Sequence, residues 1–376
     1  MDRSGSSGGK QLRRRTDRRK GVLQGLFRQR PSRFKQVQRH VRKNNEGKMP
    51  LSFYGTRDIL TKDNWKKMVS RYNPKEVLET LDKIEEKKRL DEAGVPIPDT
   101  FLILEDLIDL ERFEKWLSER KEGFVIKPSR GHGGSGVLVV LKRVASRFIL
   151  TSGRGVEKHQ LERHARKIIE GHYTKGTPDR VIIEQKLTLS RKLRELMTPG
   201  LADIRVVALK GFPLMAMTRL PTRRSGGKAN IHQGAIGAGI SISDGAIGSA
   251  TYLRKNVKLH PVSGRALIGF RFNMWDEILE TASAAADAMD MGFVGVDLAV
   301  DDRKGVVVLE VNKRPGLEIQ NANRSGLKRR IRYVERYIRK NGKQIMDLGP
   351  GIKAELSKVW DAKDWKGKKE QIEPEE

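Results

Sequence analysis

Apolar and polar residues alternate along the chain with the two periods that distinguish strands from helices. Residues 292–318, with the sequence GFVGVDLAVDDRKGVVVLEVNKRPGLE, form the clearest pattern, two apolar strands joined by a short polar turn. A turn centred between Arg303 and Lys304 pairs the two strands so that Asp297 faces Glu310. The sequence therefore predicts a hairpin that brings two carboxylates together.

The polar face of this hairpin predicts a cation site. Two carboxylates that face each other in an apolar hairpin repel and lose hydration, unless a cation or a shared proton offsets the cost. Asn312 shares the strand face of Glu310, about 7 Å along the chain, and adds an amide oxygen. Oxygen ligands without His or Cys suit Mg²⁺ or Mn²⁺, and Mg²⁺ usually combines few protein ligands with substrate phosphates. An exposed hairpin with charges on its polar face would give the same pattern.

Helical and strand patterns alternate through the rest of the chain, which predicts a mixed α/β fold. Asn273 is expected to cap a helix that carries acidic residues in its first turn. The end of the chain, from residue 353 to 376, resembles a loosely held charged tail. Helices are predicted over 74–95, 107–121, 157–170, 273–292 and 331–338, and strands over 101–104, 124–128, 137–141, 180–187, 203–209 and 214–220.

A glycine-rich loop follows the predicted strand that ends in Lys127. Four glycines within RGHGGSGV, residues 130–137, allow the backbone to approach a ligand and point N–H groups at a phosphate. No Gly-Lys-Ser/Thr opens a helix here, and a strand rather than a helix follows, so the loop is neither a Walker loop nor a dinucleotide fingerprint. It predicts a phosphate cover with Lys127 beside it, and a plain glycine hairpin turn is the alternative.

Other polar residues mark candidate ligand positions near strand ends. Glu184 closes a buried strand whose edge suits adenine, although an ordinary strand end would look the same. Asp203 and Arg205 share one strand face, which fits either a polar ligand or a cross-strand ion pair. The segment 222–239 is long, glycine-rich and cationic, which is uncommon unless such a loop is functional or disordered.

Composition narrows the class of protein. The chain has 376 residues, enough for one large or two ordinary domains, and no Cys, which excludes disulfides and thiolate chemistry. No apolar run approaches the length of a membrane span or a signal peptide, so a soluble cytoplasmic protein is expected.

The net charge of +29 is concentrated near the N-terminus. Residues 1–50 contain 16 Lys or Arg and 3 Asp or Glu, a net charge of +13. Residues 10–48 are therefore a candidate contact for an anionic surface or a polyanion. A solvated basic arm is the alternative, because only Phe27 and Phe34 are available there for base stacking.

Taken in order, these motifs resemble the ATP-grasp superfamily. Residues 73–336 are similar to its alpha-L-glutamate ligase-like branch, relatives of the enzymes that add glutamate to a ribosomal protein's C-terminus. The similarity is carried by the runs FVIKPSRGHGGSG, DIRVVALKGFPLMAMTRLPT, GKANIHQGA and LEVNKRPGLEIQNAN. It implies an ATP-grasp fold, in which two α/β lobes grip ATP, and a ligase that phosphorylates a carboxylate and joins it to an amine.

The resemblance also implies roles for individual residues. Arg205 would face the transferring phosphoryl group, and Asp203 the ribose. The metal ligands, for one or two Mg²⁺ or Mn²⁺ ions, would be Asp297, Glu310 and Asn312. Lys228 and Asn230 would face the phosphates, and Lys228 with Arg205 would be catalytic. Lys83 and Lys127 would contact the phosphates or the base, and Glu184 and Gln185 the adenine edge. The glycines implied at the ATP site are Gly133, Gly134 and Gly136.

The expected organisation has three parts. A basic extension spans residues 1–48, an ATP-grasp domain 49–340, and a charged tail 341–376. Within the domain we expect a short N-terminal segment, a nucleotide lobe and a metal and substrate lobe, over residues 49–98, 99–190 and 191–340. Two alternatives to a ligase stay open, a nucleotide-binding regulatory module without catalysis and a polyanion or nucleic-acid binder that acts through its basic arm.

Overall fold

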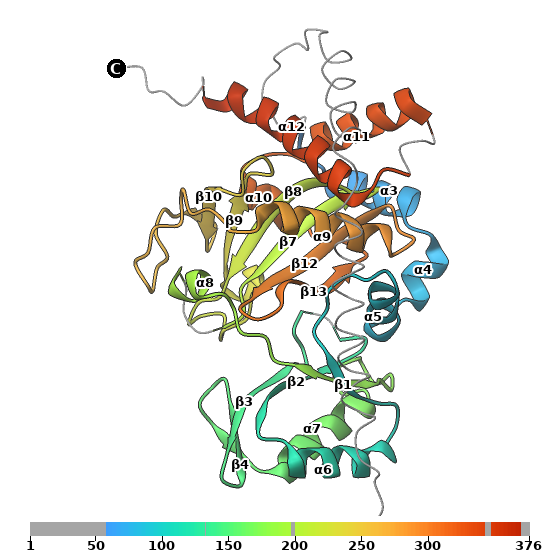
Figure 1. The fold of residues 1–376 in the computed structure, drawn as a ribbon, viewed down its shortest axis with the longest axis vertical. Helices are drawn as coiled ribbons and strands as arrows, with labels where there is room; N and C mark the ends of the chain where they lie inside the picture. Colours follow the sequence, from blue (N-terminus) through green and yellow to red (C-terminus); the bar gives the residue numbers. More distant parts are fainter. Residues whose placement is uncertain (1–57, 132, 197–199, 343–346, 370–376) are drawn as a thin grey trace, which may run out of the picture.

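The computed structural model describes residues 58–131, 133–196, 200–342 and 347–369. Two lobes, each built on an antiparallel sheet with helices beside it, lie one above the other along the long axis (Figure 1). The mixed α/β class predicted from the sequence is therefore confirmed. The basic extension expected at residues 1–48 lies outside the described residues.

The small lobe is a six-stranded sheet with two helices. Helices α6 (Asp109–Glu119) and α7 (Lys158–Ile169) contact each other and the sheet, and they bury Phe113, Leu117 and Leu161 against it. The strands, in spatial order, are β1 (Thr100–Leu104), β6 (Val181–Gln185), β2 (Glu122–Pro128), β3 (Leu138–Val144), β4 (Arg147–Leu150) and β5 (Gly155–Val156).

The large lobe is a seven-stranded sheet with helices on both faces. Successive residues of its strands enter opposite cores, so that Val206 packs on the side of α9 (Trp275–Asp287) and Val207 on the other side. The second face is covered by α3 (Lys62–Tyr72), α10 (Glu318–Asn323) and α11 (Lys328–Asn341). The strands, in spatial order, are β11 (Lys255–Asn256), β10 (Ile247–Tyr252), β9 (Ile236–Ile240), β8 (Phe212–Leu220), β7 (Asp203–Leu209), β12 (Phe293–Asp301) and β13 (Gly305–Asn312).

The hairpin of β12 and β13 contains the predicted pair, because Asp297 lies opposite Glu310. Its turn is centred on Arg303, half a residue from the expected position, since Asp301 pairs with Gly305. A β-bulge next to Asp297 inserts one extra residue into β13 and restores the expected register. The prediction of the pair is confirmed, and the predicted turn centre is wrong.

The single helix predicted over 74–95 is interrupted. It forms α4 (Lys75–Thr80) and α5 (Lys83–Glu92), separated at Asp82. The Asp82 carboxylate accepts hydrogen bonds from the backbone N–H groups of Ile84 and Glu85, as an N-cap does. The cap competes with helix continuation and makes Lys83 the first residue of α5.

Two further expectations at helix ends are wrong. Asn273 does not cap α9, because Met274 holds the cap position with φ +60° and the Asn273 side chain accepts a hydrogen bond from Lys192 Nζ. The predicted tail contains α12 (Pro350–Lys369). Lys353 of α12 is 2% exposed and its Nζ lies 2.7 Å from Asp287 Oδ2, which fixes α12 to α9. Ile352, Leu356 and Val359 supply an apolar stripe that the surrounding charges obscure in the sequence.

The cationic loop predicted over 222–239 is shorter than expected. Residues 231–233 form a 3-10 turn, η2 (Ile231–Gln233), and β9 begins at Ile236. Asn230 caps that turn, since its Oδ1 accepts a hydrogen bond from the His232 N–H at 3.0 Å. The turn fixes the part of the loop that faces the small lobe.

Candidate active site

The glycine loop between β2 and β3 lies against the large lobe. Gly133, Gly134 and Gly136 have φ values of +63°, +76° and +74°, a region that glycine enters without steric cost. A Cβ built on Gly133 would lie 3.7 Å from Asn230 Nδ2, and one built on Gly134 would lie 3.8 Å from Lys228 Cδ. The loop therefore adjoins the two residues predicted to face phosphates.

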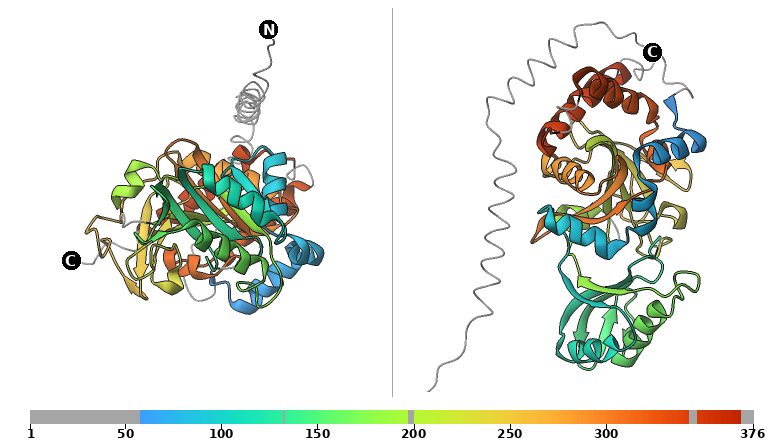
Figure 2. Two further views of the ribbon diagram at one scale, coloured as in Figure 1. Left: turned by 90° about the horizontal axis from the view of Figure 1, so that it is seen from below. Right: turned by 90° about the vertical axis from the view of Figure 1, so that its right-hand side faces the viewer.

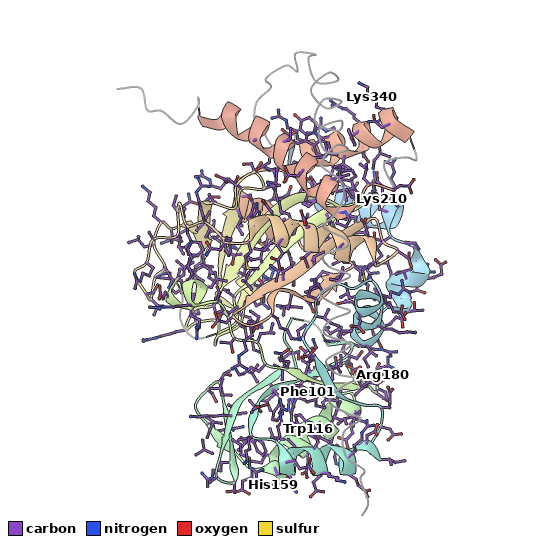
Figure 3. All side chains as sticks on the ribbon, in the orientation of Figure 1. Phe101, Trp116, His159, Arg180, Lys210 and Lys340 are labelled. Atoms are coloured by element: carbon purple, nitrogen blue, oxygen red, sulfur yellow. The ribbon has the colours of Figure 1, made fainter. Side chains whose placement is uncertain are left out.

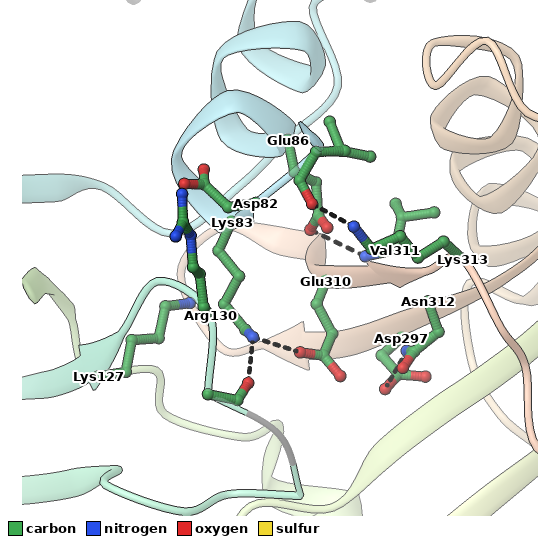
Figure 4. Close-up of polar contacts among 12 residues, drawn as sticks. Asp82, Lys83, Glu86, Lys127, Arg130, Asp297, Glu310, Val311, Asn312 and Lys313 are labelled. Atoms are coloured by element: carbon green, nitrogen blue, oxygen red, sulfur yellow. Dashed lines mark hydrogen bonds and ion pairs between the residues drawn. The ribbon is translucent and has the colours of Figure 1, made fainter. Parts of the chain in front are cut away.

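Lys83 connects the glycine loop with the hairpin of β12 and β13, as Figure 4 shows. Its Nζ donates a hydrogen bond to the Gly131 carbonyl oxygen at 2.7 Å and lies 3.7 Å from Glu310 Oε2. Its position follows from the cap at Asp82, which starts α5 in the space between the two lobes. The amine thus lies where the two lobes approach each other.

A cluster of two lysines and one glutamate lies beside the glycine loop. Glu184 of β6 is 6% exposed, and its carboxylate lies 2.7 Å from Lys127 Nζ and 2.9 Å from Lys87 Nζ. Burial opposes ionisation of Glu184, but the two ammonium groups outweigh it and hold the pKa of the carboxyl below its ordinary value. Burial also lowers the pKa of Lys87, in spite of its pairing with Glu184. With both lysines protonated, the cluster carries one positive charge in excess.

A second cluster of two arginines and two aspartates lies in the large lobe. Arg205 binds Asp297 in a bidentate manner, with Nε to Oδ1 and Nη2 to Oδ2 both at 2.6 Å. Arg219 binds both carboxylate oxygens of Asp203, with Nε to Oδ1 at 2.7 Å and Nη2 to Oδ2. Its Nη2 also lies 2.7 Å from Asp297 Oδ2. The four residues form a compact network with no net charge.

The two aspartates of this network differ in their pKa. Burial and the charge of Asp297 raise the pKa of Asp203, although Arg219 opposes this. Burial also disfavours the charged form of Asp297, but Arg205 and Arg219 outweigh it and keep its pKa below the ordinary value. Asp297 is therefore the permanent anion of the network.

The donor set at the hairpin fits Mg²⁺ in its chemistry. Glu310 is partly exposed, with a side chain 35% accessible, and its nearest cation, Lys83, lies 3.7 Å away. Asn312 donates through Nδ2 to Asp297 Oδ2 at 3.1 Å, which leaves its amide oxygen as the metal-binding end. Asp297 is already bound by two guanidinium groups, so Glu310 and Asn312 are the more accessible oxygen donors. Within the described residues no three His, Cys, Asp or Glu side chains form a cluster that could hold a metal ion by themselves.

Another buried carboxylate, that of Glu86, holds the outer edge of the hairpin. β13 is the edge strand of the large sheet, and Glu86 Oε1 accepts a hydrogen bond from the Val311 N–H at 2.8 Å. Val311 lies between Glu310 and Asn312, so this bond fixes the backbone that carries both donors. Burial, together with the nearby charge of Glu310, raises the pKa of Glu86 to about 8.

Several predicted site residues are engaged by other protein groups. Asp203, expected at the ribose, is bound by Arg219, and Arg205, expected at the phosphoryl group, is bound by Asp297. Gln185 bonds to the start of the small lobe, since its N–H donates to the Asp99 carbonyl oxygen at 2.8 Å. The predicted roles of these residues stay predictions.

Sequence reasoning missed Arg219, Lys87 and Glu86. Arg219 lies directly opposite Asp203 in the ladder of β7 and β8, so the register of that hairpin would have found it. Lys87 and Glu86 lie in the run KIEEKKRL, in which charged residues are typical of a solvated helix surface. Only the insertion of α5 between the lobes reveals that these two side chains are buried.

In the described part of the chain, no helix combines the length and the apolar character needed to cross a bilayer. This agrees with the absence of a long apolar run in the sequence.

Comparison with known proteins places the chain in a family. The sequence model of the family described as sugar-transfer associated ATP-grasp matches residues 64–336. No curated protein matches the chain.

Solved structures show distant similarity. The ATP-grasp ligase PsnB complexed with minimal precursor is 15% identical, with 68% of this chain and 60% of that chain covered and a TM-score of 0.36. The D-cycloserine synthetase DcsG is 16% identical, with 69% and 70% covered and a TM-score of 0.38. The D-alanine–D-alanine ligase from Bacillus anthracis complexed with ATP is 16% identical, with 69% and 68% covered and a TM-score of 0.39. The chain thus spans 60% of the length of PsnB, and similarity this low assigns no activity to it.

Proposed function

The chain belongs to the sugar-transfer associated ATP-grasp family, and from this premise we propose that it is an ATP-dependent carboxylate–amine ligase. In such a reaction a carboxylate oxygen attacks the γ-phosphorus of ATP, which gives an acyl phosphate and ADP. The amine nitrogen then attacks the acyl carbon, phosphate leaves, and the nitrogen loses a proton. ATP supplies the free energy, and no protein nucleophile is needed.

One observation carries the proposal, the opposition of charge between the two lobes. The small lobe presents a glycine loop beside the surplus positive charge of Lys87 and Lys127, which suits phosphates. The large lobe presents Glu310 and Asn312, which suit a hard cation. Lys83 lies between the two sets. A nucleotide with its metal complements this arrangement.

Each group has a defined task in the proposed reaction. Backbone N–H groups at Gly133 and Gly134, with Lys228 beside them, would hold the terminal phosphates. Lys83 and Lys127 would balance phosphate charge, and the bond from Glu86 to Val311 would hold the metal-binding donors in place. Mg²⁺ bound by Asp297, Glu310 and Asn312 would neutralise the charge that develops on the transferring phosphoryl group.

Arg205 would act at the phosphoryl group only after it exchanges partners. Its guanidinium holds Asp297 through two bonds of 2.6 Å, and its side chain is 10% exposed. The polyphosphate of ATP is a stronger anion than one carboxylate, and a cation at Asp297 would replace the lost guanidinium. The buried pair therefore supplies a binding group that becomes available with the loaded nucleotide.

Glutamate is the first candidate for the amino acid that is joined. This follows from the similarity of residues 73–336 to the alpha-L-glutamate ligase-like branch, which concerns the runs DIRVVALKGFPLMAMTRLPT and LEVNKRPGLEIQNAN. The acceptor is an amine if the amino acid supplies the carboxylate, and a carboxylate if the amino acid supplies the amine. A peptide and a small molecule are both within this class.

The test is an incubation of the purified protein with Mg-ATP and a panel of amino acids, each alone and with candidate peptide acceptors. ADP formation that depends on both organic substrates, with a product heavier by one condensed amino acid, is the expected result. The Glu310→Gln variant is the matched control and should give no product. Tight Mg-ATP binding without ADP formation across the whole panel would instead favour a regulatory nucleotide-binding module.

A further inference from the structure

A basic face covers two helices at the end of the molecule opposite the small lobe. Helices α3 and α11 lie together at this end in Figures 1 and 2, and Lys340 marks it in Figure 3. We define the basic face by the exposed cationic side chains of these helices, which are Lys62, Lys66, Lys67, Arg71, Arg332, Arg336, Arg339 and Lys340.

The cationic residues form one continuous surface because the two helices are joined by polar contacts. At 3.6 residues per turn the four cations of α11 lie on one side of that helix, and the four of α3 are spread over about half of its circumference. Arg71 Nη1 lies 3.3 Å from Glu335 Oε1, and Tyr72 Oη donates to the same carboxylate oxygen at 2.7 Å. Arg332 Nη2 lies 2.9 Å from Asp58 Oδ1, just before α3. The two cationic stripes therefore meet around Glu335.

The acidic residues nearby do not neutralise this face. α3 contains one acidic residue, Asp63, and α11 contains one, Glu335. The side chains of Glu335 and Asp58 are only 22% and 16% exposed, so they serve mainly to fix the two helices together. The face thus displays a large surplus of positive charge to solvent.

We propose that the basic face docks the protein onto the surface of an anionic lipid bilayer. Each Lys or Arg side chain near an anionic bilayer adds to the attraction, without any need for a shaped pocket. Because the face lies opposite the small lobe, docking would keep the candidate active site away from the bilayer. The proposal does not depend on the ligase activity.

The aromatic residues of these helices favour lipid over nucleic acid. Trp65 Nε1 donates to the Pro315 carbonyl oxygen at 2.8 Å, Tyr72 is bound to Glu335, and Tyr337 packs on Trp360 with ring centroids 5.4 Å apart. Tyr333 of α11 is also held, because its hydroxyl accepts a hydrogen bond from Arg329 Nε at 3.2 Å. Since these rings are bound by protein groups, the described part of the face offers no platform on which bases could stack. An anionic bilayer attracts such a face through its charge and needs no exposed aromatic ring.

The sequence before α3 supports the same partner. Residues 1–50 add 16 Lys or Arg, and Leu23, Leu26 and Phe27 are interleaved among them. Stable attachment to a bilayer usually needs two signals, such as a cationic patch together with inserted apolar groups. The N-terminal sequence, which precedes α3 in the chain, contains residue types that can supply the second signal.

The test is co-sedimentation of the full-length protein with vesicles of phosphatidylcholine alone or with phosphatidylglycerol added. The variant carries Lys62→Gln, Lys66→Gln, Arg339→Gln and Lys340→Gln. A matched control removes four exposed cations from the small lobe by Lys115→Gln, Lys121→Gln, Lys142→Gln and Arg147→Gln. Both variants have the same net charge, and far-ultraviolet circular dichroism verifies their folding.

We expect the parent to bind only the anionic vesicles, and less as salt is raised. The partition coefficient of the basic-face variant onto the anionic vesicles should be lower than that of the parent by about tenfold or more. The control variant should bind like the parent. Equal binding by the two variants would overturn the proposal, because the N-terminal arm or net charge alone would then suffice. Loss of binding to an RNA oligonucleotide in the basic-face variant, with vesicle binding unchanged, would also overturn it in favour of a nucleic acid.

Discussion

The two buried charge clusters of this protein differ in the cations that they use. In the small lobe two lysines hold Glu184, and in the large lobe two arginines hold Asp203 and Asp297. A lysine is a point charge on a flexible stem, whereas a guanidinium fixes a carboxylate through two parallel bonds. The small-lobe cluster is therefore suited to exchange its partner readily for a ligand. The large-lobe cluster is suited to keep its geometry until a nucleotide and a metal ion together replace the pair of Arg205 and Asp297.

The clusters also differ in charge. The two lysines exceed their single carboxylate by one charge, while the arginines and aspartates cancel. Next to the neutral network lies Glu310, whose one ion-pair partner among the described residues is Lys83, at 3.7 Å. The lobes thus approach each other with a positive side and a negative side, and a magnesium nucleotide supplies the opposite charge to each. The comparison predicts that substitutions in the arginine network affect stability most and substitutions around Glu184 affect binding.

The largest effect is expected for Asp297→Ala. This change leaves Arg205 and Arg219 buried without their shared carboxylate, a loss that typically costs about 3–5 kcal/mol of unfolding free energy. ADP formation should disappear as well. Urea denaturation followed by circular dichroism measures the first effect. Asp302→Ala, at a half-exposed ion pair of the same hairpin, is the control and should change stability by about 1 kcal/mol or less. A stable Asp297→Ala variant would contradict the structural role of the network.

The next effect, Glu310→Gln, separates chemistry from stability on the same hairpin. Glu310 is partly exposed, so its neutral isostere should leave the urea midpoint nearly unchanged. Loss of one charged contact to the phosphoryl-transfer site should lower ADP formation about 100-fold or more at saturating ATP. Turnover at the parental rate with Mg²⁺ would show that the metal assignment at this position is wrong.

The pH dependence of stability provides a third test, at Glu86. Among the described residues no cation lies within ion-pair distance of this carboxylate, unlike Glu184 and Asp297, and its pKa is raised to about 8. The folded protein therefore holds a proton there that the unfolded chain releases above its ordinary pKa of 4.5. Between these two values the contribution of Glu86 to stability falls as pH rises, by up to about 1.4 kcal/mol per pH unit.

Glu86→Gln keeps a carbonyl oxygen for the Val311 N–H and removes the titration. Urea denaturation without added metal from pH 5 to 9 measures the free energy of unfolding of both proteins. The difference between them should change in favour of the variant up to about pH 8 and stay constant above it. A difference that stays constant over this range would mean that Glu86 is ionised in the folded protein.

The sequence pattern identified site residues whose positions follow from strand pairing. It missed site residues whose positions depend on how helices pack between or against the lobes. Asp297 and Glu310 could be paired from hairpin register alone. The pairing was right although the predicted turn centre was not, because the bulge beside Asp297 offsets the difference of half a residue. Glu86 and Lys87 could not be found this way, because a charged helix has the same sequence pattern on a surface or between two lobes. The same limit explains α12, whose apolar stripe is visible only once the surface that receives it, which includes Phe212 and Leu214 of β8, is known.

The smallest effect is expected on the affinity for ATP, when each of the two lysines that pair with Glu184 is replaced. Lys127 is the next-to-last residue of β2, the strand that leads into the glycine loop. Lys87 also donates to the Pro98 carbonyl oxygen at 3.0 Å, away from the loop. Lys127→Met should therefore remove a direct phosphate contact and raise the Kd for ATP about tenfold or more, as expected for a charged hydrogen bond. Lys87→Met acts only through the charge of Glu184 and should raise it about two- to fivefold. Isothermal titration with Mg-ATP measures both values, and equal losses would mean that the two lysines serve Glu184 alone and that neither reaches the nucleotide.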